Sequence, residues 1–115
     1  MKDWILSLKH FQDQLGRDGK RFFVGMAHGT MTVELYKPQG RDPQTPHSQD
    51  ELYFIVAGIG TFFKAGQRQP FGPGDVIFVE AGVEHRFEDF TDDFETWVVF
   101  WGPQGGERQE PEARA

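Results

Sequence analysis

Short apolar runs alternate with polar turn residues along most of the chain. From Arg21 onward, clusters of Gly, Pro and Asp interrupt these runs every eight to twelve residues. Short runs rich in Phe and β-branched residues, with turn signals at regular spacing, are typical of an antiparallel sandwich or barrel. We expect strands at 21–27, 30–37, 51–57, 59–64, 67–71, 75–80, 84–88 and 94–101. The predicted fold class is all-β, an antiparallel β-sandwich or jelly-roll barrel.

The N-terminal residues follow a different period, because apolar side chains recur there at near-helical spacing. They are Trp4, Ile5, Leu8, Phe11 and Leu15. Asp3 is the expected N-cap and Gly16 the expected end of this short helix. We therefore expect a helix within 1–16 that packs on the barrel and a barrel domain over 17–101. Residues 102–115 carry almost no apolar side chains, which predicts a disordered tail.

Composition and charge narrow the possible partners. The net charge of −6, from 12 Lys and Arg against 18 Asp and Glu, repels phosphate backbones, so nucleic acid is not expected. The sequence has neither a basic run for an anionic membrane surface nor the roughly 18 consecutive apolar residues of a membrane span. A cytoplasmic protein is expected. The chain has no Cys, which excludes disulfides and thiol chemistry and leaves any metal to His and carboxylate ligands.

Candidate metal ligands lie around the one long polar loop, 38–50. If the extended conformation starts within this loop, alternate residues face one side. These residues are Thr45, His47, Gln49, Glu51 and Tyr53. His85 opens a later strand, and three ligands converge if the two strands lie side by side. Two imidazoles and one carboxylate suit an open site for a divalent metal such as Fe, Mn, Zn or Ni.

Two segments carry a family resemblance. Residues 45–58 resemble the first cupin motif, in which a His-x-His pair is followed by Glu and, after six residues, by Gly. His47, Glu51 and Gly58 match it. Residues 74–89 resemble the second motif through its Gly-Asp start, its turn Gly and its His, which are Gly74, Asp75, Gly82 and His85. The resemblance to small single-domain cupins (RmlC-like, conserved-barrel type) covers about 21–101 and implies a jelly roll with a metal at its mouth.

The motifs also depart from the family pattern. Thr45 stands where the first His belongs, or Gln44 if the loop is one residue longer. The resemblance therefore implies three metal ligands, His47, Glu51 and His85, with Gln44 or Thr45 as a weak fourth position or a water in its place. The motif Pro and the closing Asn are replaced by Glu80 and Asp89.

Two functions stay open at this point. The first is a metal-dependent enzyme of dioxygenase, isomerase or lyase type acting on a small molecule, with Glu51 or Tyr53 as catalytic candidates. The second is a non-catalytic binder of a sugar or an acid without a tightly bound metal, which the missing first His favours. Gln49 and Tyr53 are candidates for contacting the small molecule.

The remaining expectations concern the core, the surface and assembly. We expect Phe78 in the core, together with Tyr53, Phe62, Phe87 and Trp97, and Asp50 in contact with solvent. An open sandwich leaves strand edges that need a cover. The apolar stripe of the helix and strand 94–101 therefore predict a homodimer.

Overall fold

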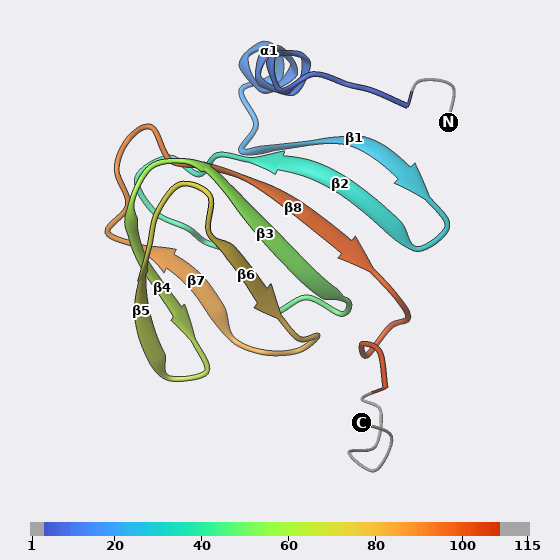
Figure 1. Cartoon of the computed structure of the whole chain (residues 1–115), viewed down its shortest axis with the longest axis vertical. Helices are drawn as coiled ribbons and strands as arrows, with labels where there is room; N and C mark the ends of the chain where they lie inside the picture. Colours follow the sequence, from blue (N-terminus) through green and yellow to red (C-terminus); the bar gives the residue numbers. More distant parts are fainter. Residues whose placement is uncertain (1–3, 109–115) are drawn as a thin grey trace.

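The computed structural model describes residues 4–108, which form one helix and eight strands (Figure 1). The helix is α1 (Leu8–Asp18). The strands are β1 (Phe22–His28), β2 (Met31–Tyr36), β3 (Asp50–Ala57), β4 (Gly60–Lys64), β5 (Gln67–Phe71), β6 (Val76–Val79), β7 (His85–Glu88) and β8 (Glu95–Trp101). Each predicted strand is present to within one residue at either end, because Gly, Pro and Asp turns fix where each strand stops.

The strands form two antiparallel sheets that face each other. The five-stranded sheet has the order β1-β2-β8-β3-β6, and the three-stranded sheet has the order β5-β4-β7 (Figure 1). All strand pairs in both sheets are antiparallel. The predicted all-β class is confirmed. Within residues 4–108, no helix is long and apolar enough to cross a membrane.

The core between the sheets is mostly aromatic. Ring pairs lie in tilted or edge-to-face contact, with 4.6 Å between the centroids of Phe87 and Phe94 and 4.8 Å between those of Phe62 and Phe87. Such pairs contribute beyond the apolar area that they bury. Phe71 and Tyr53 belong to the same buried cluster. This aromatic cluster joins β3, β4 and β7, and two of these strands, β3 and β7, carry Glu51 and His85 of the site.

The helix begins later than the sequence analysis predicted. Ser7 is the N-cap, and its side chain accepts a hydrogen bond from the backbone N–H of His10 at 3.0 Å. Trp4 and Ile5 therefore precede the helix and are exposed, while the expected N-cap at position 3 lies outside the described residues. The predicted end at Gly16 is also wrong. The helix continues to Asp18, and Gly19, with a left-handed backbone (φ 64°), caps it, as glycine does readily.

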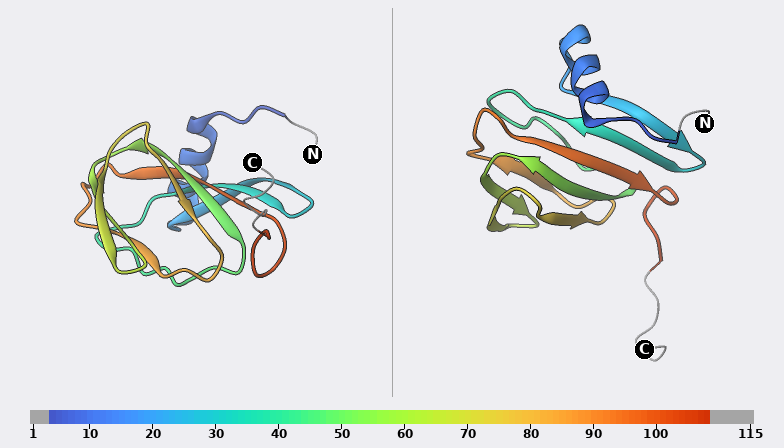
Figure 2. Two further views of the ribbon diagram at one scale, coloured as in Figure 1. Left: turned by 60° about the horizontal axis from the view of Figure 1, so that its bottom comes forward. Right: turned by 45° about the horizontal axis from the view of Figure 1, so that its top comes forward.

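The apolar stripe of α1 is covered within the chain. Phe11 and Leu15 are buried against Leu35 of β2 and the Trp97 side of the five-stranded sheet. Figure 2 shows the helix lying over the β1 and β2 end of this sheet. A Cβ at Gly25 of β1 would lie 2.3 Å from the Phe11 ring, so only glycine permits this approach. The helix stripe is thus an intramolecular contact rather than an open interface.

The loop from β3 to β4 depends on the motif glycine. Gly58 has a φ of 94°, and a Cβ on it would lie 2.5 Å from the backbone Cα of Phe94. Both the backbone conformation and the close contact therefore require glycine. This residue sets the exit angle of β3, the strand that carries Glu51.

The first part of the predicted tail folds against the sandwich instead. The N–H of Gly105 donates to the Ser48 carbonyl at 2.7 Å, and the N–H of Glu107 donates to the Asp50 carboxylate at 2.8 Å. Asp50 also accepts from the N–H of Ala81 at 2.9 Å and is buried. Asp50 is therefore a structural acceptor. The prediction that it contacts solvent is wrong. Residues 109–115 lie outside the described part of the chain.

The outer face of β3 and β6 is apolar and open to solvent. Phe54 on β3 pairs with Val76 on β6, and these side chains are 39% and 57% exposed. Phe78, which pairs with Leu52, is 44% exposed. The prediction that Phe78 lies in the core is wrong, because the register of β6 directs Ile77 and Val79 inward.

Candidate metal centre

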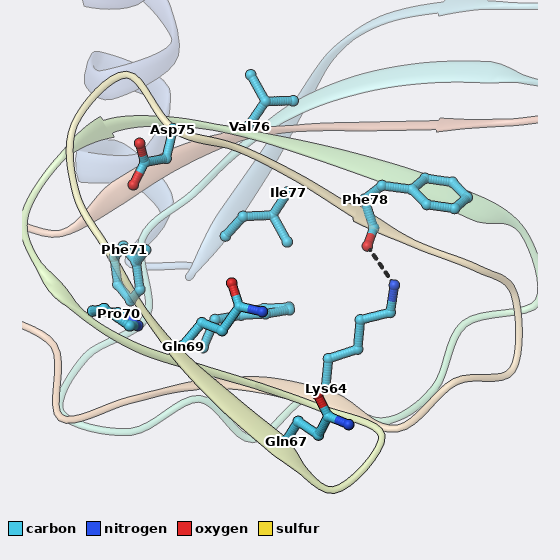
Figure 3. A pocket seen from close by; sticks show the side chains of 10 residues that line it. Lys64, Gln67, Gln69, Pro70, Phe71, Asp75, Val76, Ile77 and Phe78 are labelled. Atoms are coloured by element: carbon cyan, nitrogen blue, oxygen red, sulfur yellow. Dashed lines mark hydrogen bonds between the residues drawn. The ribbon is translucent and has the colours of Figure 1, made fainter.

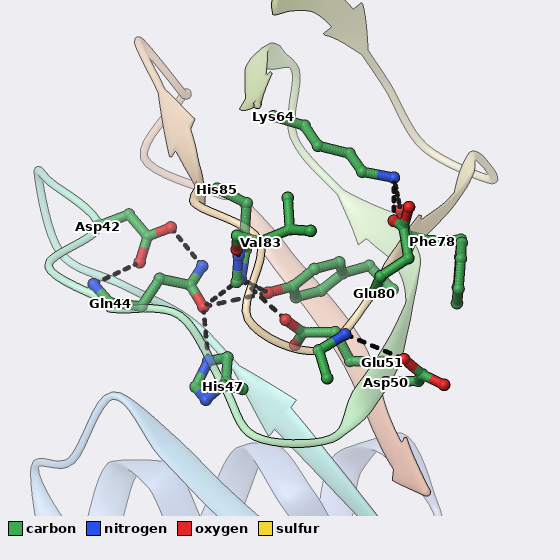
Figure 4. A network of polar contacts seen from close by, with 12 residues as sticks. Asp42, Gln44, His47, Asp50, Glu51, Lys64, Phe78, Glu80, Val83 and His85 are labelled. Carbon is green, nitrogen blue, oxygen red and sulfur yellow. Dashed lines mark hydrogen bonds and ion pairs between the residues drawn. The ribbon is translucent and has the colours of Figure 1, made fainter. Parts of the chain in front are cut away.

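Three predicted ligands come together at one end of the interior. His47 lies in the loop before β3, Glu51 on β3 and His85 at the start of β7 (Figure 4). One ligand atom from each residue lies within 4.8 Å of the others. Glu51 and His85 are buried, at 1% and 2% exposure. This His47–Glu51–His85 group can hold a metal ion.

The Glu51 carboxylate lacks partners. Among residues 4–108, neither of its oxygens has a hydrogen bond of acceptable geometry, although both are buried. Oε1 lies 2.8 Å from His85 Nε2, but the contact is not aligned as a hydrogen bond. Burying a charged carboxylate without a partner is costly, and a bound cation would remove this cost.

The Nε2 atom of His85 lies close to three oxygen atoms. Its Nδ1 lies 2.9 Å from the Val83 carbonyl oxygen, so in the tautomer that donates there Nε2 carries a free lone pair. Nε2 faces the Tyr53 hydroxyl at 3.1 Å and the Gln44 amide oxygen at 3.2 Å, in addition to Glu51. A single nitrogen cannot hydrogen-bond three oxygens well. The carbonyl contact at Nδ1 is the outer-shell support that metal-binding histidines use.

Gln44 is the fourth polar group of this cluster. Its Nε2 donates to Asp42 Oδ2 at 2.5 Å, which turns the amide oxygen toward the site. This oxygen lies 3.1 Å from His47 Nε2 and 3.1 Å from the Tyr53 hydroxyl. The loop thus brings Gln44 to the centre, whereas Thr45, the other residue considered for this position, is exposed.

Asp42 holds the loop in place and was not expected to have a role. Its carboxylate accepts hydrogen bonds from the Phe87 backbone N–H at 2.8 Å, from the Tyr36 hydroxyl and from Gln44. It thereby joins the loop to β2 and β7 beside the site. The only sequence signal is an acidic residue two positions before Gln44, which is common in turns and does not identify this role.

The two histidines differ in protonation. Burial lowers the pKa of His47, so its ring is neutral near pH 7 and suited to bind a metal. Burial acts in the same direction on His85, but Glu51 and the Val83 carbonyl outweigh it and raise the pKa of His85. The raised pKa therefore favours a protonated His85 in the metal-free protein.

Tyr53 and Gln49, the candidates for contacting a small molecule, have different positions. The Tyr53 ring is buried and its hydroxyl faces Gln44 and His85; burial, reinforced by Glu51, raises the Tyr53 pKa. The Gln49 amide instead donates to the carbonyls of Thr30 and Gly102, at 3.0 and 2.9 Å. Because β3 begins only at Asp50, the assumed alternation does not extend back to Gln49, which holds two loops together.

A pocket of about 740 Å³ opens beside the His47–Glu51–His85 group. Its walls combine site residues with apolar side chains such as Phe22, Val98 and Phe100. Lys20 and Arg21 are exposed at its edge. Glu34 of β2 also lines it, and the sequence analysis missed this residue. Burial, followed by the charge of Glu51, raises the pKa of Glu34 to about 7.

A second hollow of about 410 Å³ lies between β5 and β6 (Figure 3). Lys64 crosses it and donates to the Phe78 carbonyl at 2.9 Å. The Asp75 carboxylate, which also lines this hollow, accepts a hydrogen bond from the Gly72 N–H at 2.8 Å and closes a turn. The two charged groups of this hollow, Lys64 and Asp75, thus have structural partners, so the chemistry is expected at the first pocket.

Comparison with known proteins agrees with this architecture. Residues 32–101 match the model of the cupin domain (Cupin_2). The chain is 37% identical over 76 residues to the uncharacterised protein SCO3923 of Streptomyces coelicolor, a match that covers 64% of this chain and 72% of that protein. The chain therefore belongs to the cupin family.

Solved structures show the same fold. A cupin 2 conserved barrel domain protein from Salinispora arenicola has a TM-score of 0.61 and 22% identity, over 70% of this chain and 74% of its own. A chain from the crystal structures of the DMSP lyases RdDddP and RnDddQII has a TM-score of 0.53 and 25% identity, over 64% of this chain and 38% of its own.

Proposed function

We propose that this protein is a metal-dependent enzyme that acts on a small organic molecule in the pocket beside His47, Glu51 and His85. The buried Glu51 carboxylate carries the proposal, because neither of its oxygens has a well-formed hydrogen bond within residues 4–108 and a divalent cation could bind it together with the neighbouring imidazole nitrogens. These three residues are the proposed ligands. Gln44 supplies an amide oxygen as the weaker fourth ligand, in the orientation that Asp42 imposes.

The donor set is compatible with Fe, Mn, Zn or Ni, since imidazole and carboxylate ligands suit all of these ions. An ion held there would act as a Lewis acid toward an oxygen atom of the substrate. Tyr53 points its hydroxyl into the same cluster, which supports a role for it in orienting the substrate or moving a proton. The similarity to a DMSP lyase chain supports the lyase class among the reactions considered, with an isomerase or a dioxygenase as the alternatives.

A second candidate function is non-catalytic binding of a small sugar or acid. The 2.8 Å contact between His85 Nε2 and Glu51 Oε1 favours it, because a protonated His85 would neutralise Glu51 without a metal. In that case the pocket would retain its shape and lack an open coordination position. The two functions differ in whether the purified protein holds a metal.

The test is the metal content of the protein, purified without a His-tag or chelator and measured by elemental mass spectrometry. We expect near-stoichiometric metal in the native protein and in His28→Ala, a control at the exposed end of β1. His85→Ala and the shape-conserving Glu51→Gln should lose it. No metal in the native protein, even after reconstitution with each candidate ion, would leave only the binding function.

A further inference from the structure

Glu34 lies inside the sandwich although it belongs to a strand near the sheet edge. In the register of the five-stranded sheet, Glu34 of β2 pairs with Val98 of β8, and Val98 pairs with Tyr53 of β3. Paired residues share one face of a sheet, so Glu34 faces the same interior as Tyr53. It lines the pocket that contains His47 and Glu51.

The carboxyl group of Glu34 has no protein partner in this position. Within residues 4–108, the influences on its ionisation are burial and the like charge of Glu51, with no hydrogen bond or cation among them. Tyr36, the next inward residue of β2, donates its hydroxyl proton to Asp42 instead. A partly buried carboxyl group without a protein partner at a pocket wall is available to a polar group of a ligand that enters the pocket.

We propose that Glu34 is the residue that exchanges a proton with a small organic acid bound beside the His47–Glu51–His85 group. This inference rests on the proposed function for the position of the ligand, but the state of Glu34 is a property of the metal-free chain as well. The ligand class follows from the pocket walls. Phe22, Val98 and Phe100 suit an apolar or planar body, and the cations of Lys20 and Arg21 at the edge suit a carboxylate.

Burial, followed by the charge of Glu51, raises the pKa of Glu34 into the neutral range. The other titratable and polar groups that line the same pocket are Glu51 and Tyr53 of β3, His47 and Gln44 of the loop before β3, Tyr36 of β2, and Lys20 and Arg21 at the edge before β1. The neighbouring positions on β1 and β8 are Val24 and Val98, which bring no charge. A pKa of about 7 for Glu34 leaves both protonation states populated under ordinary conditions, as general acid–base catalysis requires.

The proton transfer is balanced by solvent. When Glu34 acts as the acid, its carboxyl O–H bond breaks and the proton moves to an oxygen of the bound ligand. The resulting carboxylate regains a proton from water at the pocket mouth. When Glu34 acts as the base, the same bonds form and break in reverse.

The first experiment follows the side-chain carboxyl carbons of the metal-free protein by ¹³C NMR as a function of pH. We expect one Glu resonance that titrates near pH 7, that is absent in Glu34→Gln and that is retained in Glu107→Gln, an exposed control. A Glu34 resonance that titrates below pH 5 would overturn the proposal. This measurement does not depend on metal binding, so its failure is distinct from a failure of the proposed function.

The second experiment measures benzoate binding to the metal-free protein by isothermal titration calorimetry, because a bound cation would offset the charge of Glu51 that helps to raise the pKa of Glu34. Protonated Glu34 donates to the probe's carboxylate, and ionised Glu34 repels it. The affinity should therefore fall by about tenfold per pH unit above the pKa of Glu34. In Glu34→Gln this fall should disappear, while Glu107→Gln should keep it. The same pH dependence in all three proteins would refute the role of Glu34.

Discussion

Neighbouring residues of β3 face two contrasting surfaces. Glu51 and Tyr53 point inward and are each only 1% exposed, although one is charged and the other carries a hydroxyl. Phe54, the residue after Tyr53, points outward and is 39% exposed. Phe78 of β6 continues the outer surface at 44% exposure. The usual arrangement of a sheet, with apolar residues buried and polar residues in solvent, is thus reversed along this part of the strand.

Both surfaces are unfavourable for an isolated chain. A buried carboxylate without a partner costs free energy, and so does a contiguous set of exposed aromatic and aliphatic side chains. Both costs are removed when each face of the strand has its own partner. The inner face calls for a cation and a small molecule, and the outer face calls for another apolar surface.

Metal binding should give the largest effect on the inner face. At a free metal concentration 100 times its dissociation constant, the free energy of unfolding should rise by about 2.7 kcal/mol. Urea denaturation of the native protein, with the metal and with chelator, measures this change. Glu51→Gln should show no such rise, and Glu107→Gln should behave as the native protein. An equal rise in Glu51→Gln would place the metal elsewhere.

Removing the inner charge should stabilise the metal-free protein. Leu is close to Glu in volume, so Glu51→Leu replaces an unpartnered carboxylate by an apolar side chain and lets His85 become neutral. We expect the free energy of unfolding in chelator at pH 8 to rise by about 1–2 kcal/mol. Urea denaturation measures it, with Glu107→Leu as the control.

The opposite sign would be informative as well. If Glu51 and His85 form a stabilising ion pair, Glu51→Leu removes one partner of a buried pair and should cost about 3–5 kcal/mol. That result would contradict the unpartnered state of Glu51 and favour the binding function without a metal. The comparison between the two faces would then hold only for the outer one.

The strands could be predicted closely, but the direction of side chains could not. Turn residues act locally, so they mark strand ends in the sequence itself. Glu34 and Phe78 are two of the residues that were missed or placed wrongly for this reason. In β2 the alternation rule places the apolar set, Val33 and Leu35, inward, whereas β6 is apolar at all four positions and alternation gives it no direction. Here β2 directs Leu35 outward beneath α1, and β6 directs Phe78 outward as well. Only the pairing register of distant strands reveals this.

The site was predictable in part for a related reason. His47, Glu51 and His85 lie within or beside spaced motifs, and the structure brings them together. Whether Gln44 or Thr45 accompanies them depends on a loop whose path is set by the hydrogen bonds that Asp42 accepts from the Phe87 N–H and the Tyr36 hydroxyl. Contacts 45 residues apart in sequence leave no local pattern. The helix start was missed because Ser7, rather than the first apolar residue, decides it.

The smallest change in fold stability, with a clear change in assembly, is expected on the outer face. The homodimer stays a prediction, and the exposed side chains Phe54, Val76 and Phe78 now give it a location that differs from the helix stripe.

Sedimentation velocity of the native protein should give a dimer. Phe78→Lys should give a monomer, because a buried charge in an apolar interface is costly. Its free energy of unfolding as a monomer should change by no more than about 0.5 kcal/mol, as for other surface positions. Ile59→Lys, at an apolar position before β4 that is 58% exposed, should remain dimeric. A native monomer near 13.2 kDa would refute the dimer, and the exposed face of β3 would then need a different partner.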